Sequence, residues 1–396
     1  MILDPILFWK PVWNKRYQYV TPWSGCTIYR ASLWEVAAPL IAAMAATLTI
    51  WVRDPLAEWS YELAVFAVAM AMCMRRPRLQ LNATSLALGA IALWGFIELA
   101  LGATEYRYAT LNAGPRFAAL AATAYIAPTG RSRAVFLRMF VWFAFGLSVL
   151  SVLAYYSSRG KVVWIFPSEY PDVWGPFLNR NNFAAFLELA MPVALWLAIT
   201  RDRAYVWIAA AMLAAGIASA SRAGAVLLTL ESLAVVAVAP GSRRMLARFG
   251  VAAVVLTAIA GAGQLAGRIF EPDPLRYRRE MARSALAMIR GRPFSGFGLG
   301  TFATVYPQYA EFDAGATVNH AHNDWLEWAS EGGVGFAAAW GVLAAAMLRR
   351  ARGSIWAIGV PAVMIHALVD YPFARFGVSA WTFLLIGMRE LDPGEH

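Results

Sequence analysis

The chain has 396 residues, of which 60% are hydrophobic and only 15% are charged. A soluble domain of ordinary composition carries about a quarter charged residues, so this composition excludes a soluble globular protein and indicates a polytopic membrane protein. The net charge of +10 does not indicate nucleic acid binding, because the basic residues gather in alternate short connections between apolar segments.

Apolar windows recur along the chain, and each is near the roughly 20 residues that a helix needs to cross a bilayer core. In chain order they are 34–52, 59–74, 83–101, 113–127, 134–156, 181–199, 204–219, 223–239, 249–266, 333–348, 355–370 and 376–390. Lipid offers no partner for open backbone groups, and the windows lack the alternation of barrel strands. We therefore predict an all-α fold with about 12 transmembrane helices in a single domain, residues 1–396.

Basic residues mark one side of this predicted bundle. The clusters are RRPR (75–78), RSR (131–133), RDR (201–203), GSRR (241–244) and RRAR (349–352). Such clusters are typical of cytoplasmic loops, so we expect both termini in the cytoplasm. The connections expected outside are 53–60, 102–112, 157–180, 217–222, 267–332 and 371–375.

The N-terminal segment and the cysteines add two expectations. Residues 1–33 lack a signal-peptide apolar core with a cleavage site, and are expected to form an interfacial segment before the first span. The only cysteines, Cys26 and Cys73, lie in or near predicted cytoplasmic parts, so no disulfide framework is expected.

Two of the outside connections are long, 157–180 and 267–332. Loops of this length are often functional. Within the second, apolar residues at spacings of three and four predict a helix over 275–290. The run GRPFSGFGLGTF (291–302) then breaks that helix, and its glycines permit a close approach of the backbone.

Arginines are unexpectedly common on the predicted outer side. Arg180 and Arg222 stand at the ends of predicted helices, and a further group lies in the long loop at Arg276, Arg278, Arg279, Arg283, Arg290 and Arg292. The guanidinium fork suits bidentate binding of phosphate or pyrophosphate. The alternative for the second group is that it is solvated or paired with Glu271, Asp273 and Glu280.

The segment NHAHNDWLEWASEGG (319–333) carries two of the chain's four histidines, His320 and His322. As a helix cap, Asn323 or Asp324 accepts from the first turn, Asp324 with Glu327 resembles a capping box, and Gly332 and Gly333 end the helix. This interpretation leaves both histidines unused. A metal site of His320, His322 and Asp324 has suitable ligand types, but the sequence shows no further Cys/His cluster. A histidine acting as general base is the favoured interpretation.

Other ionisable residues fall within predicted spans, where they are costly and usually functional or paired. His366 and Asp370 are four residues apart and share a helix face, so a simple His–Asp pair that packs the bundle is the alternative to function. Glu188 and Glu98 are similar cases, and Glu231 lies deeper in its span.

With these residues identified, the chain resembles the O-antigen ligase and O-antigen polymerase superfamily of bacterial membrane glycosyltransferases. The ordered motifs that carry the resemblance are LNRNNFAAFLELAMP (178–192), ASRAGAVLL (220–228), RREMARSALAMIRGRPFSGFGLGTF (278–302), HAHNDWLEWASEGG (320–333) and HALVDYPF (366–373). They span about half of the chain. The first half is similar only in hydropathy and topology.

The resemblance implies a glycosyltransferase C-like membrane fold in the bacterial inner membrane, with short helices and the active site in the periplasmic region 267–332. It implies an inverting, metal-independent transfer of a glycan from undecaprenyl pyrophosphate to an acceptor hydroxyl, with no cofactor. The catalytic histidine of the family corresponds to His322, which precedes Asn323. Its arginines correspond to Arg180, Arg222 and Arg278, with Arg279 as the alternative for the last.

One position departs from the family pattern. The glycine expected after nine intervening residues beyond Asn323 is met in this alignment by Gly333, but the Gly, Thr or Tyr expected three positions further is Phe336. The departure concerns the packing of the following helix more than the chemistry. The supporting residues expected around His322 are Asn179, His320, Asn323, Asp324, His366 and Asp370.

The leading interpretation is a ligase that joins a lipid-linked polysaccharide to lipid A–core, within the lipids of the membrane. A polymerase that extends the glycan on its carrier and a protein O-oligosaccharyltransferase would use the same donor. A lipid or polysaccharide transporter is the non-enzymatic alternative. It predicts a charged path through the bilayer and internal symmetry, whereas the polar residues here gather on one face.

Overall fold

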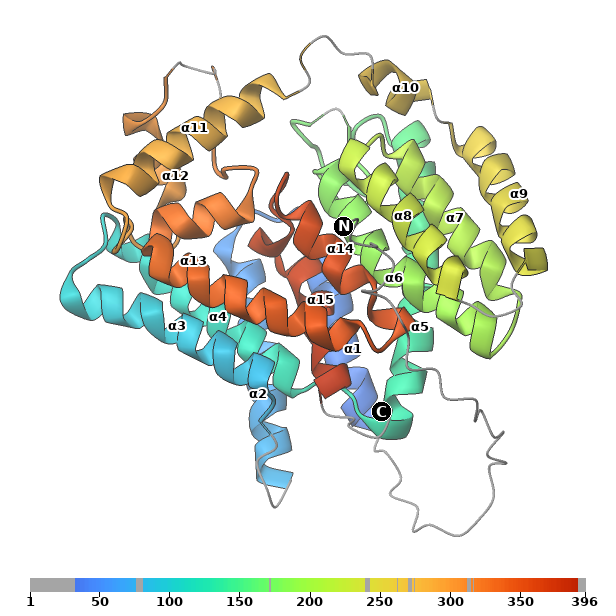
Figure 1. The fold of residues 1–396 in the computed structure, drawn as a ribbon, viewed down its shortest axis with the longest axis horizontal. Helices are drawn as coiled ribbons and strands as arrows, with labels where there is room; N and C mark the ends of the chain where they lie inside the picture. The colour runs from blue at the N-terminus through green and yellow to red at the C-terminus, as the bar shows by residue number, and fades with distance from the viewer. Residues whose placement is uncertain are drawn as a thin grey trace, which may run out of the picture.

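A computed structural model describes residues 33–390 except 76–80, 171, 239–242, 262, 270–272, 274, 312–314 and 316. The expected interfacial segment and Cys26 lie outside the described residues. Within them the chain forms helices and no strand (Figure 1). The helices that precede the long loop are α1 (Leu33–Leu48), α2 (Pro55–Arg75), α3 (Ala83–Leu101), α4 (Arg107–Tyr125), α5 (Gly130–Ser157), α6 (Arg180–Thr200), α7 (Tyr205–Ala218), α8 (Arg222–Val238) and α9 (Arg243–Ala260).

The remaining helices belong to the long loop and the C-terminal part of the chain. They are α10 (Gly263–Ile269), α11 (Arg276–Gly291), α12 (Phe302–Val305), α13 (Asp324–Ala351), α14 (Gly359–His366) and α15 (Phe376–Glu390). Short 3₁₀ turns, η2 (Tyr306–Gln308), η3 (Ile355–Ala357) and η4 (Pro372–Ala374), join them. The helix predicted over 275–290 is therefore confirmed as α11, and the glycine-rich run does end it.

Each predicted apolar window overlaps a helix, so the all-α membrane fold is confirmed. Five helices of the described chain are long and apolar enough to cross a membrane, namely α2, α3, α5, α6 and α13. Five shorter apolar helices lie at Leu33–Leu48, Tyr205–Ala218, Ala247–Ala260, Ile355–His366 and Phe376–Met388. The number of spans beyond the five long helices stays a prediction.

Two predicted spans end earlier than their hydropathy indicates. The window 249–266 is interrupted after Ala260, because Gly261 adopts φ +90°, a left-handed conformation that stops helices. The Tyr156 hydroxyl donates to the freed Ala260 carbonyl at 2.7 Å. The window 355–370 is helical only to His366, and turns follow. Apolar composition continues past both points, so hydropathy alone does not detect these ends.

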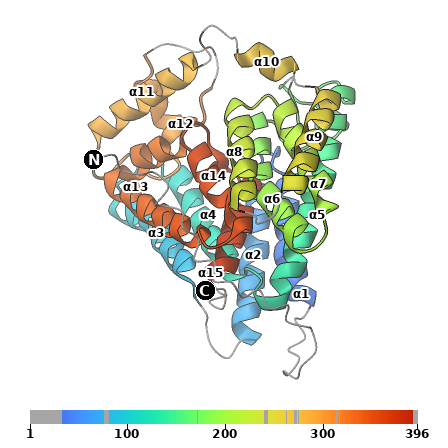
Figure 2. The ribbon, with the colours of Figure 1, turned by 45° about the vertical axis from the view of Figure 1, so that its right-hand side comes forward.

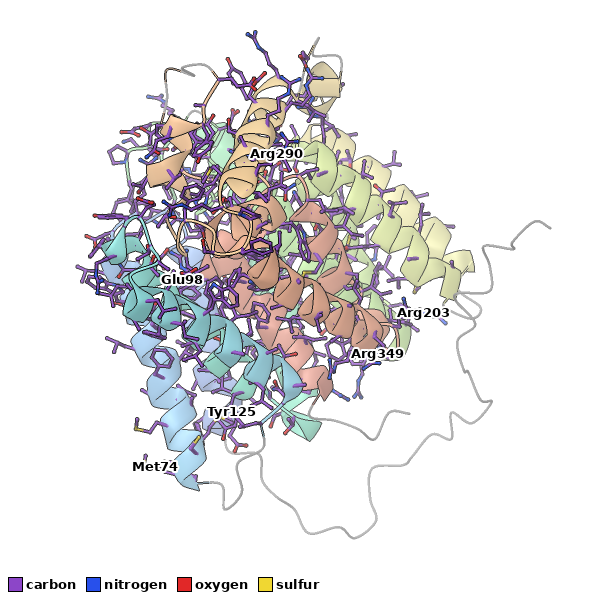
Figure 3. All side chains as sticks on the ribbon, turned by 60° about the vertical axis from the view of Figure 1, so that its left-hand side comes forward. Met74, Glu98, Tyr125, Arg203, Arg290 and Arg349 are labelled. Carbon is purple, nitrogen blue, oxygen red and sulfur yellow. The ribbon has the colours of Figure 1, made fainter. Side chains whose placement is uncertain are left out.

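The connections predicted outside lie together at one end of the bundle. Contacts join them in pairs: Arg53 to Glu169 at 3.6 Å, Glu105 N–H to the Phe297 carbonyl at 2.9 Å, Arg268 to the Ala220 carbonyl at 3.0 Å, and Arg375 to Glu58 at 3.2 Å. Figure 2 shows α10 and α11 both at this end. In Figure 3, Arg290 lies there while Met74, Arg203 and Arg349 lie toward the opposite end. We call the first end the outer face.

The helix α6 occupies the centre of the bundle. In its apolar stretch 83% of the residues are buried, against at most 44% in the other four long helices. It packs against α7, α8 and α14. The N-terminus of α6, at Arg180, therefore opens at the middle of the outer face rather than at its rim.

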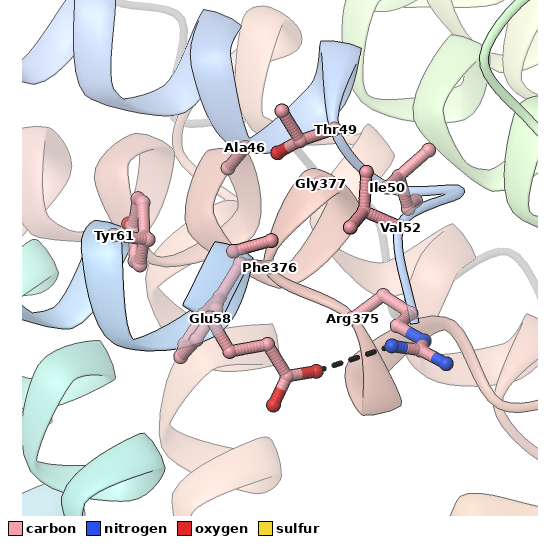
Figure 4. Close-up of a pocket in the computed structure, with 10 residues that line it drawn as sticks. Ala46, Thr49, Ile50, Val52, Glu58, Tyr61, Arg375, Phe376 and Gly377 are labelled. Atoms are coloured by element: carbon pink, nitrogen blue, oxygen red, sulfur yellow. Dashed lines mark hydrogen bonds and ion pairs between the residues drawn. The ribbon is translucent and has the colours of Figure 1, made fainter. Parts of the chain in front are cut away.

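A half-buried ion-pair network holds the loop before α15 against α2 and α4. Glu58 accepts from Arg116 at 2.5 Å and from Arg375 at 3.2 Å. Figure 4 shows Glu58 and Arg375 beside a cavity of about 20 Å³, lined also by Tyr61 and Phe376, which is room for about one water. Because Arg375 directly follows η4, the network fixes the position of the segment 371–375.

The predicted stop at Gly332 and Gly333 is present as a kink inside α13. Gly333 has φ +75° and ψ 179°, and the helix resumes immediately after it. The glycine-rich run packs against this break, since Val334 N–H donates to the Pro293 carbonyl at 2.8 Å and Gly298 N–H to the Glu331 carbonyl at 2.8 Å. The kink separates the outer residues 324–332 from the apolar remainder of the helix.

Substitution of Gly333 by alanine is expected to destabilise the protein by about 3 kcal/mol or more. Its backbone conformation is essentially restricted to glycine, and an added Cβ would collide with the carbonyl of Phe294. Gly341→Ala in the same helix is the matched control: nothing lies within 4 Å of its Cβ position, so it should be neutral or stabilise by up to about 1 kcal/mol. Thermal unfolding in detergent measures both. Equal melting temperatures for the two variants would contradict this account of the kink.

Phe336, the residue that departs from the family pattern, is completely buried. Its ring contacts Trp94 and Phe117 with centroids 5.8 and 5.9 Å away. The larger side chain therefore fills an aromatic cluster between α13, α3 and α4. The departure changes the packing of the helix after the kink, and the Phe336 side chain also packs against Gly332 just before it.

Candidate active site

The carboxylate of Asp370 is the centre of the outer face. It is fully buried, and its Oδ2 accepts from Arg278 at 3.0 Å and from Asn181. Its Oδ1 accepts from Asn179 Nδ2 at 3.2 Å and from the Tyr371 backbone N–H at 2.9 Å. We call Asp370, Asn179, Asn181, Arg278 and His322 the Asp370 cluster.

The position of Asp370 follows from the end of α14. The helix stops at His366, yet the Asp370 N–H still donates to the His366 carbonyl at 3.0 Å, so Asp370 projects from one further turn beyond the helix. Burial alone would raise the pKa of its carboxyl group, but His322, the Arg278 guanidinium and His366 together hold that pKa well below its usual range. Asp370 therefore remains ionised at neutral pH.

His322 faces this carboxylate. Its Nδ1 lies 3.7 Å from Asp370 Oδ1, and its side chain is 30% exposed. That distance exceeds a hydrogen bond. His322 has φ +50°, a conformation that is strained for a residue with a Cβ and that concentrates at functional sites. The backbone therefore turns the imidazole toward the cluster while leaving part of it accessible.

His320 has a different environment from His322. Its Nδ1 is 2.9 Å from Glu327 Oε1, and its ring stacks on Tyr371. The other oxygen of Glu327 accepts from the Ala321 N–H at 2.8 Å. We call residues 319–323 the histidine loop. The capping box predicted from Asp324 and Glu327 is wrong, because the Glu327 carboxylate binds His320 and Ala321 of this loop and not the first turn of α13.

Asn323 is the N-cap of α13, one of the two residues predicted for this role. Its Oδ1 accepts from Leu326 N–H at 3.0 Å and its Nδ2 donates to the Leu368 carbonyl at 2.8 Å. Asp324 instead accepts from Phe373 N–H at 3.0 Å and donates its own N–H to the Ala367 carbonyl. Both residues thus tie the histidine loop to the segment that carries Asp370.

Of the three arginines assigned to the site from the motifs, one contacts the Asp370 carboxylate, and the other two bind elsewhere. Arg278 contacts Asp370. Arg180 pairs with Asp172, and Arg222 donates to the Arg268 carbonyl at 2.9 Å. Both are linked to the cluster through their neighbours, because the Ser221 hydroxyl donates to Asn181 Oδ1 at 2.7 Å and Asn181 in turn donates to Asp370.

Arg279, the alternative to Arg278, points away from the cluster. It pairs with Asp273 at 2.5 Å and is 59% exposed. Other loop arginines are also paired, Arg283 with Glu280 at 3.2 Å and Arg292 with Glu105. For Arg279, Arg283 and Arg292 the structure therefore agrees with the alternative that the loop arginines form surface ion pairs. Glu271, a predicted partner, lies outside the described residues.

One alternative predicted that His366 pairs with Asp370. In the structure it pairs with Glu188 instead. Its Nδ1 lies 2.7 Å from Glu188 Oε1, and both side chains are fully buried. The reason is geometric: the helix ends at His366, so its ring turns toward α6 while Asp370 continues outward.

The other ionisable residues predicted within spans are also placed by the structure. Glu231 is buried. Glu98 accepts from the Leu299 N–H at 2.9 Å and so holds the glycine-rich run.

Three residues of the site were missed by the sequence analysis: Asn181, Ser221 and Tyr371. The first two are adjacent to Arg180 and Arg222, and a run of polar residues at the start of an apolar span is the signal that could have indicated them. Tyr371 follows Asp370 and contacts both histidine rings. Nothing in its sequence position distinguishes it from a packing residue.

Within the described part of the chain no group of three or more His, Cys, Asp or Glu side chains could hold a metal ion. His320 and His322 instead contact Glu327 and Asp370 separately. The cationic residues, the partly exposed imidazole and the buried carboxylate form a site suited to anionic groups and proton transfer.

The fold and the site together define a helical membrane protein with a cation-lined polar centre at one end of its bundle. Residues 179–340 match the O-antigen ligase family, which confirms the resemblance to the O-antigen ligase and polymerase superfamily. The matched range includes Arg180, Arg222, Arg278 and His322 but ends before Asp370. Comparison with curated proteins found no match.

Proposed function

We propose that this protein is a membrane glycosyltransferase of the O-antigen ligase type. It transfers a glycan from undecaprenyl pyrophosphate to an acceptor hydroxyl of lipid A–core, at the periplasmic face of the bacterial inner membrane. The observation that carries the proposal is the Asp370 cluster, which brings His322 and Arg278 to one buried carboxylate at the outer face. The family match over residues 179–340 supports the same class of reaction.

In this mechanism His322 is the general base. Its Nδ1 side faces Asp370, which leaves Nε2 as the nitrogen that accepts the proton of the acceptor hydroxyl. The ionised Asp370 stabilises the imidazolium that forms, as a carboxylate does for histidine bases elsewhere. The hydroxyl oxygen forms a bond to the anomeric carbon from the face opposite the leaving group, so the configuration inverts.

The leaving group is undecaprenyl pyrophosphate, released when the bond between the anomeric carbon and the phosphate oxygen breaks. Arg278, Arg180 and Arg222 stabilise the negative charge that develops on that oxygen. One nitrogen of the Arg278 guanidinium contacts Asp370, and the side chain is partly exposed. Its remaining N–H groups are therefore available to the diphosphate in this mechanism. Because guanidinium groups neutralise the diphosphate, the mechanism assigns no step to a metal ion.

Two enzymatic alternatives share the donor and this mechanism. A polymerase would use the terminal sugar of a second lipid-linked glycan as acceptor, and a protein O-oligosaccharyltransferase would use a Ser or Thr hydroxyl. A transporter would instead need ionisable groups along a path through the bilayer. The pairing of Arg278, Asn179 and Asn181 on one outer carboxylate favours an enzyme.

The decisive experiment supplies purified protein with a lipid-linked glycan and, separately, lipid A–core, a second lipid-linked glycan or an acceptor peptide. We expect product with lipid A–core, and product with only one of the other acceptors would assign the corresponding alternative. Transfer should be unchanged by EDTA. Loss of activity in EDTA that a divalent ion restores would contradict the metal-independent mechanism.

Arg278→Gln is expected to lower kcat/KM for transfer by about 10²–10³-fold, the typical effect of removing one stabilising donor of a developing oxyanion. Arg279→Gln is the matched control, since it is the next residue on the same helix but is exposed and paired with Asp273. We expect it to stay within about threefold of wild type. Steady-state kinetics on protein with a normal melting temperature measures both, and equal losses would remove the assignment of Arg278.

A further inference from the structure

The ring of Tyr371 lies between the two histidines of the site. It stacks on His320 with centroids 4.4 Å apart and an interplanar angle of 21°, and it meets His322 edge-on at 4.8 Å and 78°. Its backbone N–H donates to Asp370 Oδ1 at 2.9 Å. One residue thus contacts both imidazoles and the central carboxylate.

His322 lacks the hydrogen bond that ordinarily orients a histidine base. Such an imidazole is usually held through its second nitrogen by a carboxylate or a carbonyl. Here that nitrogen, Nδ1, is 3.7 Å from Asp370 Oδ1 and has no hydrogen-bond partner among the described residues. The direction of the ring must therefore be set by packing, and the aromatic ring in contact with it belongs to Tyr371.

We propose that Tyr371 is the positioning residue that holds the imidazole of His322 at its working angle to Asp370, and that its aromatic ring performs this role. The inference rests on the proposed function, in which His322 is the base. An edge-on arrangement of two rings is a preferred geometry for aromatic pairs. It restrains rotation of the smaller ring without occupying either of its nitrogens.

The hydroxyl of Tyr371 has a separate role. Burial and the charge of Asp370 raise the pKa of this hydroxyl, and Asn179 is its hydrogen-bond partner. It therefore stays protonated at neutral pH and does not compete with His322 as a base. The hydroxyl holds the start of α6, while the ring faces the histidines.

This arrangement also gives His320 a role. The Glu327 carboxylate holds His320 at 2.9 Å, and the stacked imidazole covers one face of the Tyr371 ring. This stacking restrains the Tyr371 ring in its contact with His322. His320 acts through Tyr371 and not on the substrate.

The test combines Tyr371→Phe, which keeps the ring, with Tyr371→Leu, which removes it. The chain has only four histidines, so their ring resonances in isotope-labelled protein can be assigned by single substitutions. Removing the ring abolishes its ring-current shift on His322 in any case, so the informative readouts in Tyr371→Leu are broadening of the His322 resonances, as the imidazole samples several orientations, and a fall in kcat of about 10²-fold. Binding of inorganic pyrophosphate should be unchanged. Tyr371→Phe should keep the His322 resonances and stay within about fivefold of wild-type kcat.

Tyr309→Leu is the matched control, because it removes an outer-face ring that packs on Phe297 at 5.7 Å and not on a histidine. If Tyr371→Leu does not fold, Tyr371→Met takes its place, since it fills similar space without a ring. Sharp His322 resonances from a single ring orientation, together with wild-type kcat, in the ring-free variant would overturn the proposal, as would a Phe variant as impaired as Leu. If wild-type protein transfers no glycan, the proposed function fails, whereas the His322 resonances still decide whether Tyr371 positions the ring.

Discussion

Replacing His322 with glutamine is expected to lower kcat for glycan transfer by about 10³-fold, within the range that a positioned base contributes. Glutamine fills much of the same space and can donate a hydrogen bond toward Asp370, but it cannot accept a proton at neutral pH. The proton of the acceptor hydroxyl then has no recipient at the site. Single-turnover transfer with a lipid-linked glycan measures the loss directly.

Two comparisons separate this chemical role from structural damage. Binding of inorganic pyrophosphate should be unchanged in His322→Gln, because Arg278 keeps its contact with Asp370. His320→Gln should be affected much less, by about tenfold, since His320 acts through Tyr371. Near-normal transfer by His322→Gln would remove the base assignment, and a larger loss at His320 than at His322 would exchange their roles.

Replacing Asp370 with asparagine is expected to have the second large effect, on both stability and activity. The amide cannot balance the Arg278 guanidinium, and one side of it would present N–H groups to Asn179 or Asn181, which donate there now. Breaking a buried charge pair by removing one partner costs about 3–5 kcal/mol. We expect a destabilisation of that order, measured by thermal or denaturant unfolding, and a loss of transfer of about 10²-fold or more because the imidazolium of His322 loses its counter-charge.

The pH dependence distinguishes this effect from general damage. Because the pKa of Asp370 is lower in the folded protein than in the unfolded chain, its stabilisation is fully present above the unfolded value of about 4 and is lost as the pH falls through the lower, folded value. The difference in melting temperature between wild type and Asp370→Asn should therefore persist as the pH falls from about 8 to 5 and be lost only in strong acid. Asp273→Asn, at an exposed ion pair, is the control and should change stability by less than about 1 kcal/mol. A difference that disappears between about pH 8 and 5 would contradict the assignment of an ionised Asp370.

The sequence by itself determined the fold class and the approximate position of each long helix. Hydropathy reports how each segment is solvated, and this property is local, so windows such as 181–199 coincide with helices such as α6. The basic loops indicated which connections share a face, and the structure places those connections together. The sequence also singled out Arg180, Arg222, Arg278 and His322 as candidate site residues, because their motifs are local patterns. Local patterns did less well at helix ends, where a conformation such as that of Gly261 decides the outcome.

Only the tertiary structure decided how these residues are paired. Asn179 and Asn181 meet Asp370 across 191 and 189 residues of sequence, and the choice of Arg278 over Arg279 depends on which side of α11 faces the cluster. The partner of His366 proved to be Glu188 on α6 and not the nearby Asp370, and Tyr371 gained its importance only from two ring contacts. The physical reason is that burial is a property of one segment, whereas a hydrogen bond or an ion pair is a property of two, and the docking of the helices determines which two meet.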